Sequence, residues 1–286
     1  MQSNTTSLLL VGILLAVVTL RSITAKAASP QSSLSQNETK LPKAKQEKFH
    51  ANFNFIHTEK SVQTTESKEA SFQTLESTLA YTLSSQLAAT SGLEYSQNSK
   101  DSEDPRSGLS DLFVGGQLLL GESKSHRSQL AGNIILPTSK VSKDYDNLKF
   151  AVSSKYSFSW LSLGNSPVAA SIGASAKKYF TEYDTQKNGE PVKAWQHSEI
   201  GNLVFRKGKF SISASLENSH HYNSLNRRSD FFAHSQELSI QLSSQFELAL
   251  GHSNTGNWLK EDGSSSNFSS FSQNDSYFYA RAGIQL

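Results

Sequence analysis

A histidine and a serine stand side by side in the segment from Gly251 to Gly256, which reads G-H-S-N-T-G. A histidine that takes the proton of a serine hydroxyl is a common device for nucleophilic hydrolysis. However, His252 and Ser253 are adjacent, and adjacent side chains of a β-strand point to opposite faces. They could act together only across a bulge. The spacing therefore indicates a protein that is not an enzyme, and hydrolysis by His252 stays as an alternative.

Two further histidines, His220 and His221, offer imidazole nitrogens that could bind a metal ion. A protein metal site needs at least three ligands. No third ligand is evident, and the pair lies in a polar stretch, residues 218 to 231, that we predict to be a connection between strands. We therefore expect a solvated loop, no metal site and no cofactor.

Charged residues alternate with apolar ones along most of the chain. If the apolar face of each strand meets lipid, the alternate residues on the opposite face, which include the charged ones, line an interior. We predict that ten charges lie there: Glu76, Glu94, Asp111, Lys149, Lys155, Lys177, Glu217, Glu237, Glu247 and Arg281. Such rings of charge could select solutes in a pore. Alternatively, the six acids and four bases neutralise one another and brace the wall.

The segments that must position these charges alternate strictly. In the last ten residues, 277 to 286, Phe278, Ala280, Ala282, Ile284 and Leu286 share one parity, and the other parity is mostly polar. One apolar and one polar face is the pattern of a half-buried strand. Similar segments lie near residues 49–55, 75–83, 87–95, 112–120, 130–136, 148–160, 168–176, 194–205, 210–217, 238–242 and 246–250. Only 194–205 has an ambiguous parity, because either choice turns a polar residue outward.

The connections between these twelve segments are alternately short and long. The long ones are residues 58–69, 96–107, 137–147, 182–193, 218–231 and 253–275. Short turns at one end, long loops at the other and an even strand count are typical of outer-membrane barrels. A soluble β protein with one buried face would not explain this alternation. We predict an all-β chain, a transmembrane antiparallel up-and-down β-barrel of about twelve strands over residues 47–286.

The N-terminus indicates secretion. The apolar run from Leu8 to Leu20 is too short to span a membrane, and Ala25-Lys26-Ala27 resembles a cleavage site. We predict a signal peptide at 1–27 and a flexible periplasmic lead-in at 28–46.

Cysteine is absent from the chain, which excludes disulfides and thiolate metal sites. The formal net charge of +2, from 27 basic and 25 acidic residues, gives no reason to expect a nucleic-acid partner.

Two stretches carry a resemblance to known families. Residues 107–120, S-G-L-S-D-L-F-V-G-G-Q-L-L-L, and 130–140, L-A-G-N-I-I-L-P-T-S-K, resemble the outer-membrane transporters of the phenol meta-pathway degradation type. Ser110 and Ser139 stand where that family's motifs have glycine. The resemblance implies an outer-membrane barrel and no catalytic residues.

The segment at His252 is partly similar to the His-x-Ser-Asn signature of outer-membrane lipid hydrolases. Physically, Gly108 frees a loop end, Asp111 caps the strand mouth and Pro137 ends a strand.

Residues 277–286 form the predicted closing strand, which should pair with Phe49 to Phe55 and with Phe246 to His252. Its end resembles the C-terminal signal read by bacterial barrel-assembly machinery, and its polar face should bring Arg281 beside Glu247. We therefore expect a monomer in the outer-membrane lipid that passes small solutes passively. A closed structural or surface-interaction barrel is the alternative, and a lipid hydrolase using His252 is the second alternative.

Overall fold

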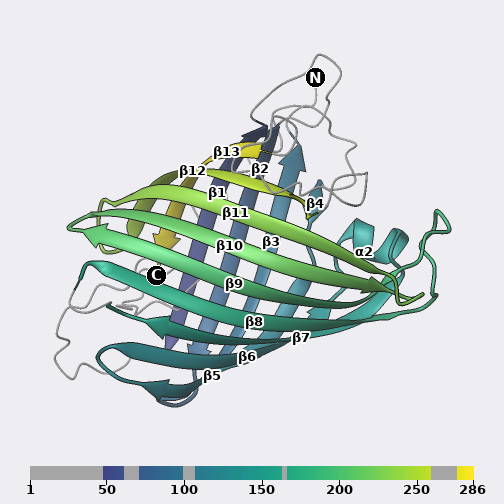
Figure 1. Ribbon diagram of the computed structural model, residues 1–286, viewed down its shortest axis with the longest axis horizontal. Helices are drawn as coiled ribbons and strands as arrows, with labels where there is room; N and C mark the ends of the chain where they lie inside the picture. Colours follow the sequence, from purple (N-terminus) through teal and green to yellow (C-terminus); the bar gives the residue numbers. More distant parts are fainter. Residues whose placement is uncertain (1–47, 61–70, 99–106, 163–165, 259–275) are drawn as a thin grey trace.

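The computed structural model describes residues 48–60, 71–98, 107–162, 166–258 and 276–286 (Figure 1). The predicted residues 1–27 and 28–46 lie outside this part. The elements are β1 Phe49–Lys60, β2 Ser71–Thr82, β3 Leu87–Asn98, β4 Gly108–Leu109, β5 Leu112–Glu122, β6 His126–Leu136, α2 Lys140–Asp144, β7 Leu148–Trp160, β8 Val168–Thr181, β9 Lys193–Lys207, β10 Phe210–Asn223, β11 Arg228–Gln241, β12 Phe246–Asn257 and β13 Ser276–Gln285. Within this part, no helix has the length and apolar character that a membrane crossing requires.

The strands form a closed antiparallel barrel of twelve strands, as predicted, and the two-residue β4 pairs outside the ring with β3. The last strand closes the ring where the sequence indicates. β13 pairs with β1, with Phe53 opposite Ile284, and with β12, with Phe246 opposite Ile284. The sheet curls so that β8 to β11 pass in front of β1 to β3 (Figure 1). The two groups therefore form opposite walls.

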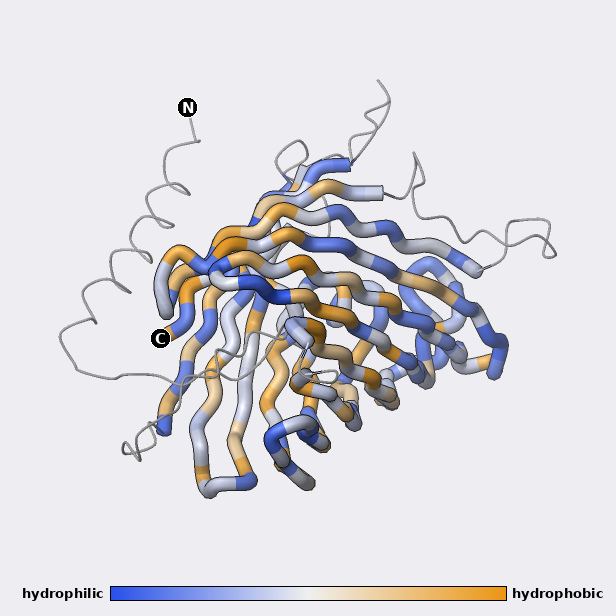
Figure 2. The backbone as a smooth tube through the Cα atoms, turned by 60° about the vertical axis from the view of Figure 1, so that its left-hand side comes forward, coloured by the Kyte–Doolittle hydropathy of each residue, from blue (hydrophilic) through white to orange (hydrophobic). Residues whose placement is uncertain are grey.

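Alternation of side chains gives the barrel an apolar outside and a polar inside. On β10, Phe210, Ile212 and Leu216 are exposed on the outer face, whereas Ser213 and Ser215 line the interior. Figure 2 shows the same alternation of hydrophobic and hydrophilic residues along neighbouring strands. The alternation follows from the two-residue period of a strand.

The strand at 194–205, whose parity the sequence leaves open, is now assigned. Leu203 and Phe205 are exposed on the outside of β9, and Asn202 lines the interior. From Trp195 onward, odd-numbered residues therefore face outward, and His197 and Glu199 share that face, whereas a register shift beside Trp195 turns Lys193 inward.

Several of the predicted long connections contain regular structure, since β1, β3 and β12 run past their predicted ends to Lys60, Asn98 and Asn257. Residues 218–223 continue β10 and residues 228–231 begin β11, so the predicted loop at 218–231 shrinks to residues 224–227. The prediction that His220 and His221 lie in a loop is therefore wrong, because both belong to β10. The hydrogen bonds of the ladder continue across this polar stretch, with His220 opposite Asp230. The connection at 137–147 contains the helix α2.

Asp111 holds the connection that follows β6. Its Oδ1 accepts hydrogen bonds from the backbone N–H groups of Thr138 and Ser139, and its Oδ2 accepts one from the hydroxyl of Ser142. Ser139 is in turn the N-cap of α2. Gly108 has φ of 129°, which favours glycine, and β6 ends at Leu136, just before the proline. The motif residues thus perform the local tasks that the sequence suggests.

Candidate functional site

A polar cavity of about 470 Å³ lies inside the barrel. It receives side chains from strands β5 to β11 and from β13, so it is surrounded by most of the ring. Its two charged residues are Lys155 on β7 and Glu237 on β11. Its neutral hydrogen-bonding residues are Gln117, Gln129, Ser157, Ser159, Ser171, Asn202, Ser213, Ser215, Ser235 and Tyr279, and Ala131, Ile172, Gly173, Ile200, Val204 and Ala214 complete the lining.

Two smaller cavities lie toward the ends of the lumen. The cavity toward the long connections measures about 60 Å³ and is lined by Asp111, Lys177 and Lys193. Asp146 also lines it, and burial raises the pKa of this carboxyl above its usual value. A hydrogen bond from the amide of Gln186 to Asp146, at 2.8 Å, acts in the opposite direction. The charge of this cavity therefore depends on the protonation of Asp146.

The cavity toward the short turns measures only about 10 Å³, close to the space that one water needs. It is lined by Asn54, Glu247 and Arg281, while the central cavity is lined by Glu237 and Tyr279. Arg281 and its partners therefore separate the wide part of the lumen from its narrow end.

Arg281 bridges two carboxylates at this narrow point. Its Nη2 lies 2.7 Å from Oε1 of Glu237 and 2.7 Å from Oε1 of Glu247. Its Nε donates to the other oxygen of Glu237 at 3.2 Å, and the hydroxyl of Tyr279 donates to the same oxygen at 3.2 Å. The three charged side chains are 12 to 18% exposed. The Glu247 partner is the one that the sequence predicts, and Glu237 completes a two-carboxylate clamp.

The hydrogen-bond network continues onto the N-terminal strands. The amide of Asn54 on β1 donates to Glu76 at 3.1 Å, and its oxygen lies 3.5 Å from Nη1 of Arg281. Glu76 is paired across the sheet with Glu94, which accepts a hydrogen bond from Ser96 at 2.7 Å. Four carboxylates thus gather near one guanidinium on the wall formed by β11–β13 and β1–β3.

In the structure, nine of the ten predicted charges lie on the face of their strand that points into the lumen, or at the mouth of the lumen. The acids Glu76, Glu94, Glu237 and Glu247 share one wall, whereas Lys155 and Lys177 stand on β7 and β8. Glu217 lies on β10, and Asp111 caps the mouth. Lys149 lies elsewhere: a register shift between Leu148 and Phe150 leaves it exposed at a bulge, and Leu148 lines the cavity instead. Parity cannot be followed through a bulge, since the extra residue reverses it.

Two residues of the site do not appear among the predicted charges. Arg206 on β9 shares the lumen parity of Asn202, but the ambiguous parity of that strand hid it. Tyr279 is uncharged, although its position two residues before Arg281 puts it on the same face. The two-residue spacing from Arg281 is therefore the feature of the sequence that places Tyr279 in the lumen.

A close contact between Tyr279 and Gly251 sets the position of the phenol ring. A Cβ atom at Gly251 would lie 2.2 Å from the ring of Tyr279, so no larger residue fits without moving the ring. We predict that Gly251→Ala lowers the free energy of unfolding by about 1–3 kcal/mol, because overpacking strains the site. Denaturant unfolding of the refolded barrel measures this loss.

Gly201→Ala is the matched control, because a Cβ at Gly201 would meet nothing within 4 Å. It should change the free energy of unfolding by less than about 0.5 kcal/mol. Equal losses in the two variants would contradict the assigned contact.

His252 and Ser253 do not form a catalytic pair. His252 lies on the outer parity of β12 with the exposed Leu248 and Leu250, so Ser253 faces the lumen. The ring of His252 contacts Gln236 at 3.1 Å and lies tilted against the ring of Phe278, with centroids 5.2 Å apart. β12 pairs with β13 in regular register at this point, without the bulge that a joint action would require.

These observations define a class of fold: a closed, twelve-stranded antiparallel barrel with an apolar outside and a polar lumen. No protein-family model and no curated protein sequence matches the chain. A crystal structure of an outer membrane channel from Pseudomonas putida F1 is similar, with a TM-score of 0.58, 12% identity and coverage of 89% of this chain and 100% of that one. The KdgM porin gives a TM-score of 0.48 and 7% identity over 82% of this chain and 98% of its own. At these identities the likeness concerns the fold alone.

Proposed function

We propose that this protein is an outer-membrane channel through which small polar solutes pass passively. The observation that carries the proposal is the cavity of about 470 Å³ inside a closed barrel, with hydroxyl, amide and charged side chains from strands β5 to β11 and β13 among its lining. Such a lining replaces hydrogen bonds that a hydrophilic solute loses when it leaves water.

The outer surface supports placement in a membrane. Large apolar side chains are exposed on the outer parity of neighbouring strands, which is costly in water and favourable in lipid. Tyr81 and Phe210 are exposed next to short turns, and Trp195 is exposed near the other end beneath the ammonium of Lys178, 4.5 Å from its ring. Aromatic residues at both ends of an apolar band fit two membrane interfaces.

The location and partners belong to the same proposal. A signal peptide at 1–27 would be cleaved after export, and residues 28–46 would lead into the barrel on the periplasmic side. The C-terminal strand would engage the barrel-assembly machinery before the barrel enters the outer-membrane lipid as a monomer. Kinship with transporters of the phenol meta-pathway degradation type rests on the motifs around Gly108 and Pro137.

Charge in the cavity limits the class of solute. Lys155 and Glu237 face the same space from strands four places apart in the ring, and hydroxyl and amide groups lie between them. A solute that carries hydrogen-bonding groups finds partners on every side, whereas an apolar one does not. We therefore infer a small hydrophilic solute.

A closed barrel is the second candidate function. The observation that favours it is the narrow end, where the space beside Arg281 and Glu247 measures only about 10 Å³. In that case the interior would only brace the wall, and the protein would act through its outer surface. Hydrolysis by His252 has no geometric support in the part of the chain that the structure describes.

Electrical recording separates the two candidates. Purified, refolded barrel added to a planar lipid bilayer should produce discrete current steps, because a water-filled lumen conducts ions. The same protein after heat unfolding is the control and should produce none. Folded protein that inserts but carries no current would overturn the channel and favour the closed barrel.

A further inference from the structure

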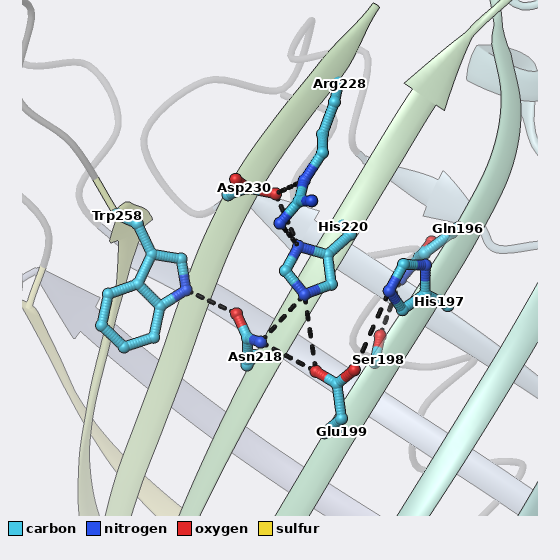
Figure 3. Close-up of polar contacts among 9 residues, drawn as sticks. All are labelled: Gln196, His197, Ser198, Glu199, Asn218, His220, Arg228, Asp230 and Trp258. Atoms are coloured by element: carbon cyan, nitrogen blue, oxygen red, sulfur yellow. Dashed lines mark hydrogen bonds and ion pairs between the residues drawn. The ribbon is translucent and has the colours of Figure 1, made fainter. Parts of the chain in front are cut away.

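Two histidines and a glutamate gather on the outer face of the barrel, outside the lumen (Figure 3). β9 and β10 pair so that His197 lies directly opposite His220, and Glu199 follows His197 by two residues on the same face. The group lies closer to the long connections than the exposed apolar residues Leu203 and Leu216. Trp195, which precedes His197 by two residues on the same face, marks the interface, so the group lies at the edge of the apolar band, next to the water.

The spacing of the nitrogen and oxygen atoms suits a single metal ion. Nε2 of His220 is 3.6 Å from Oε2 of Glu199, and Nε2 of His197 is 3.8 Å from Oε1 of Glu199. One ligand atom from each of the three residues lies within 4.8 Å of the others. Ligands about 2.0–2.2 Å from a tetrahedral Zn²⁺ stand roughly 3.3–3.5 Å apart, so small side-chain rotations would suffice.

The surrounding hydrogen bonds fix the tautomer of His220. The indole N–H of Trp258, which can only donate, lies 2.6 Å from Oδ1 of Asn218. The amide nitrogen of Asn218 therefore faces the other way, toward Nε2 of His220 at 3.0 Å and Oε2 of Glu199 at 2.8 Å. Because that amide nitrogen can only donate, Nε2 of His220 must carry a lone pair. A lone pair on Nε2 is what a metal ion needs.

The other nitrogen of the ring is held by a carboxylate. Nδ1 of His220 lies 2.5 Å from Oδ1 of Asp230, which also accepts a hydrogen bond from Nε of Arg228. Because the carboxylate of Asp230 can only accept, Nδ1 of His220 carries the proton of the ring and donates it to Asp230, while Nη2 of Arg228 lies 2.8 Å from Nδ1. A carboxylate behind a ligating histidine is the usual support of a protein metal site, since it orients the ring and increases its basicity.

We propose that His197, Glu199 and His220 bind a divalent transition-metal ion such as Zn²⁺, with Asp230 orienting His220. Two imidazoles and one carboxylate favour Zn²⁺, Ni²⁺ or Cu²⁺ over Ca²⁺ and Mg²⁺, which prefer oxygen ligands. The side chain of His220 is 12% exposed, whereas those of His197 and Glu199 are 44% and 54% exposed. The ion would thus rest on a fixed ligand from β10, receive two mobile ligands from β9 and keep water on its open side. The amide of Asn218 would release Nε2 and Oε2 as the ion binds.

Calorimetric titration of Zn²⁺ into tag-free, metal-stripped barrel in detergent tests this site. We expect one ion per barrel, and at least a tenfold loss of affinity in His197→Gln and in His220→Gln. Asp230→Asn should keep the stoichiometry but lower the affinity roughly tenfold, because it removes only the support behind the ring. Unchanged affinity in Asp230→Asn would contradict the assigned tautomer.

His57→Gln is the matched control. His57 and Glu59 have the same two-residue spacing on β1 and a similar separation of 3.5 Å, but within the described residues they belong to no three-ligand group. This variant should bind Zn²⁺ like the wild type. Wild-type affinity in either site-histidine variant, or an equal loss in His57→Gln, would overturn the proposal. Heat-dependent migration of the barrel on a gel shows that each variant is folded, and no step depends on conduction.

Discussion

Replacement of Arg281 by methionine should lower the free energy of unfolding by about 3 kcal/mol, near the lower end of the 3–5 kcal/mol lost when a buried ion pair loses one partner. The change leaves Glu237 and Glu247 without their shared guanidinium, and both carboxylates are largely buried. Some water reaches the lumen and will reduce the loss, which is why the lower end applies. Unfolding in denaturant, followed by tryptophan fluorescence of the refolded barrel, measures it.

Arg127→Met is the control for this effect. Arg127 pairs with Glu122 beside a short turn, where the pair is more exposed, so its loss should be below about 1 kcal/mol. The triple variant Arg281→Met, Glu237→Gln, Glu247→Gln should regain much of the lost stability, because no unpaired buried charge is left. A loss in Arg281→Met no larger than in Arg127→Met, or a triple variant without recovery, would show that the clamp does not stabilise the barrel.

The strands could be predicted because a two-residue period is a local property of the sequence. The apolar parity of Phe278 to Ile284 identifies the closing strand, and its pairing with β1 and β12 follows from the need to leave no open edge. The interior charges follow from the same parity. The limits of this reasoning appear at Lys149, where one extra residue in the register moves the side chain away from the lumen.

Polar strand ends could not be separated from loops by composition. Residues 218–223 comprise two Asn, one Ser, two His and one Tyr, a composition that is typical of a connection. In the structure the backbone hydrogen bonds of β10 and β11 continue past the apolar band, since pairing does not require an apolar face. Strands of 14 residues therefore extend beyond the 9 to 11 or so that a membrane requires.

The partners of a charge depend on register between strands, which a single strand does not reveal. A tight turn does reveal it: the turn around Gly208 pairs Lys207 with Phe210, and this register places His197 opposite His220. Counting back from this turn therefore places His197 and Glu199 beside His220, which composition alone does not. In contrast, Glu237 reaches Arg281 across β12, and such a contact depends on the tilt of the closed barrel.

A tryptophan at Ser157 should reduce the single-channel conductance by roughly half or more, because the cavity is the path of the ions. Ser157 on β7 and Ser213 on β10 both line this cavity, from strands three places apart in the ring. The double variant Ser157→Trp, Ser213→Trp should bring two indoles into the same space and nearly abolish the current. Recordings in planar bilayers at fixed salt compare the step sizes.

Ser154→Trp separates obstruction from a general effect of the bulky residue. Ser154 is exposed on the outer parity of the same strand, between Val152 and Tyr156, and its cross-strand neighbours are Gly132 and Ala176. A tryptophan there has room and meets lipid, so the conductance should stay at the wild-type value. If Ser157→Trp conducts as well as Ser154→Trp while both are folded, ions do not cross the central cavity. If both lose conductance equally, the loss reflects insertion or folding instead of the path through the lumen.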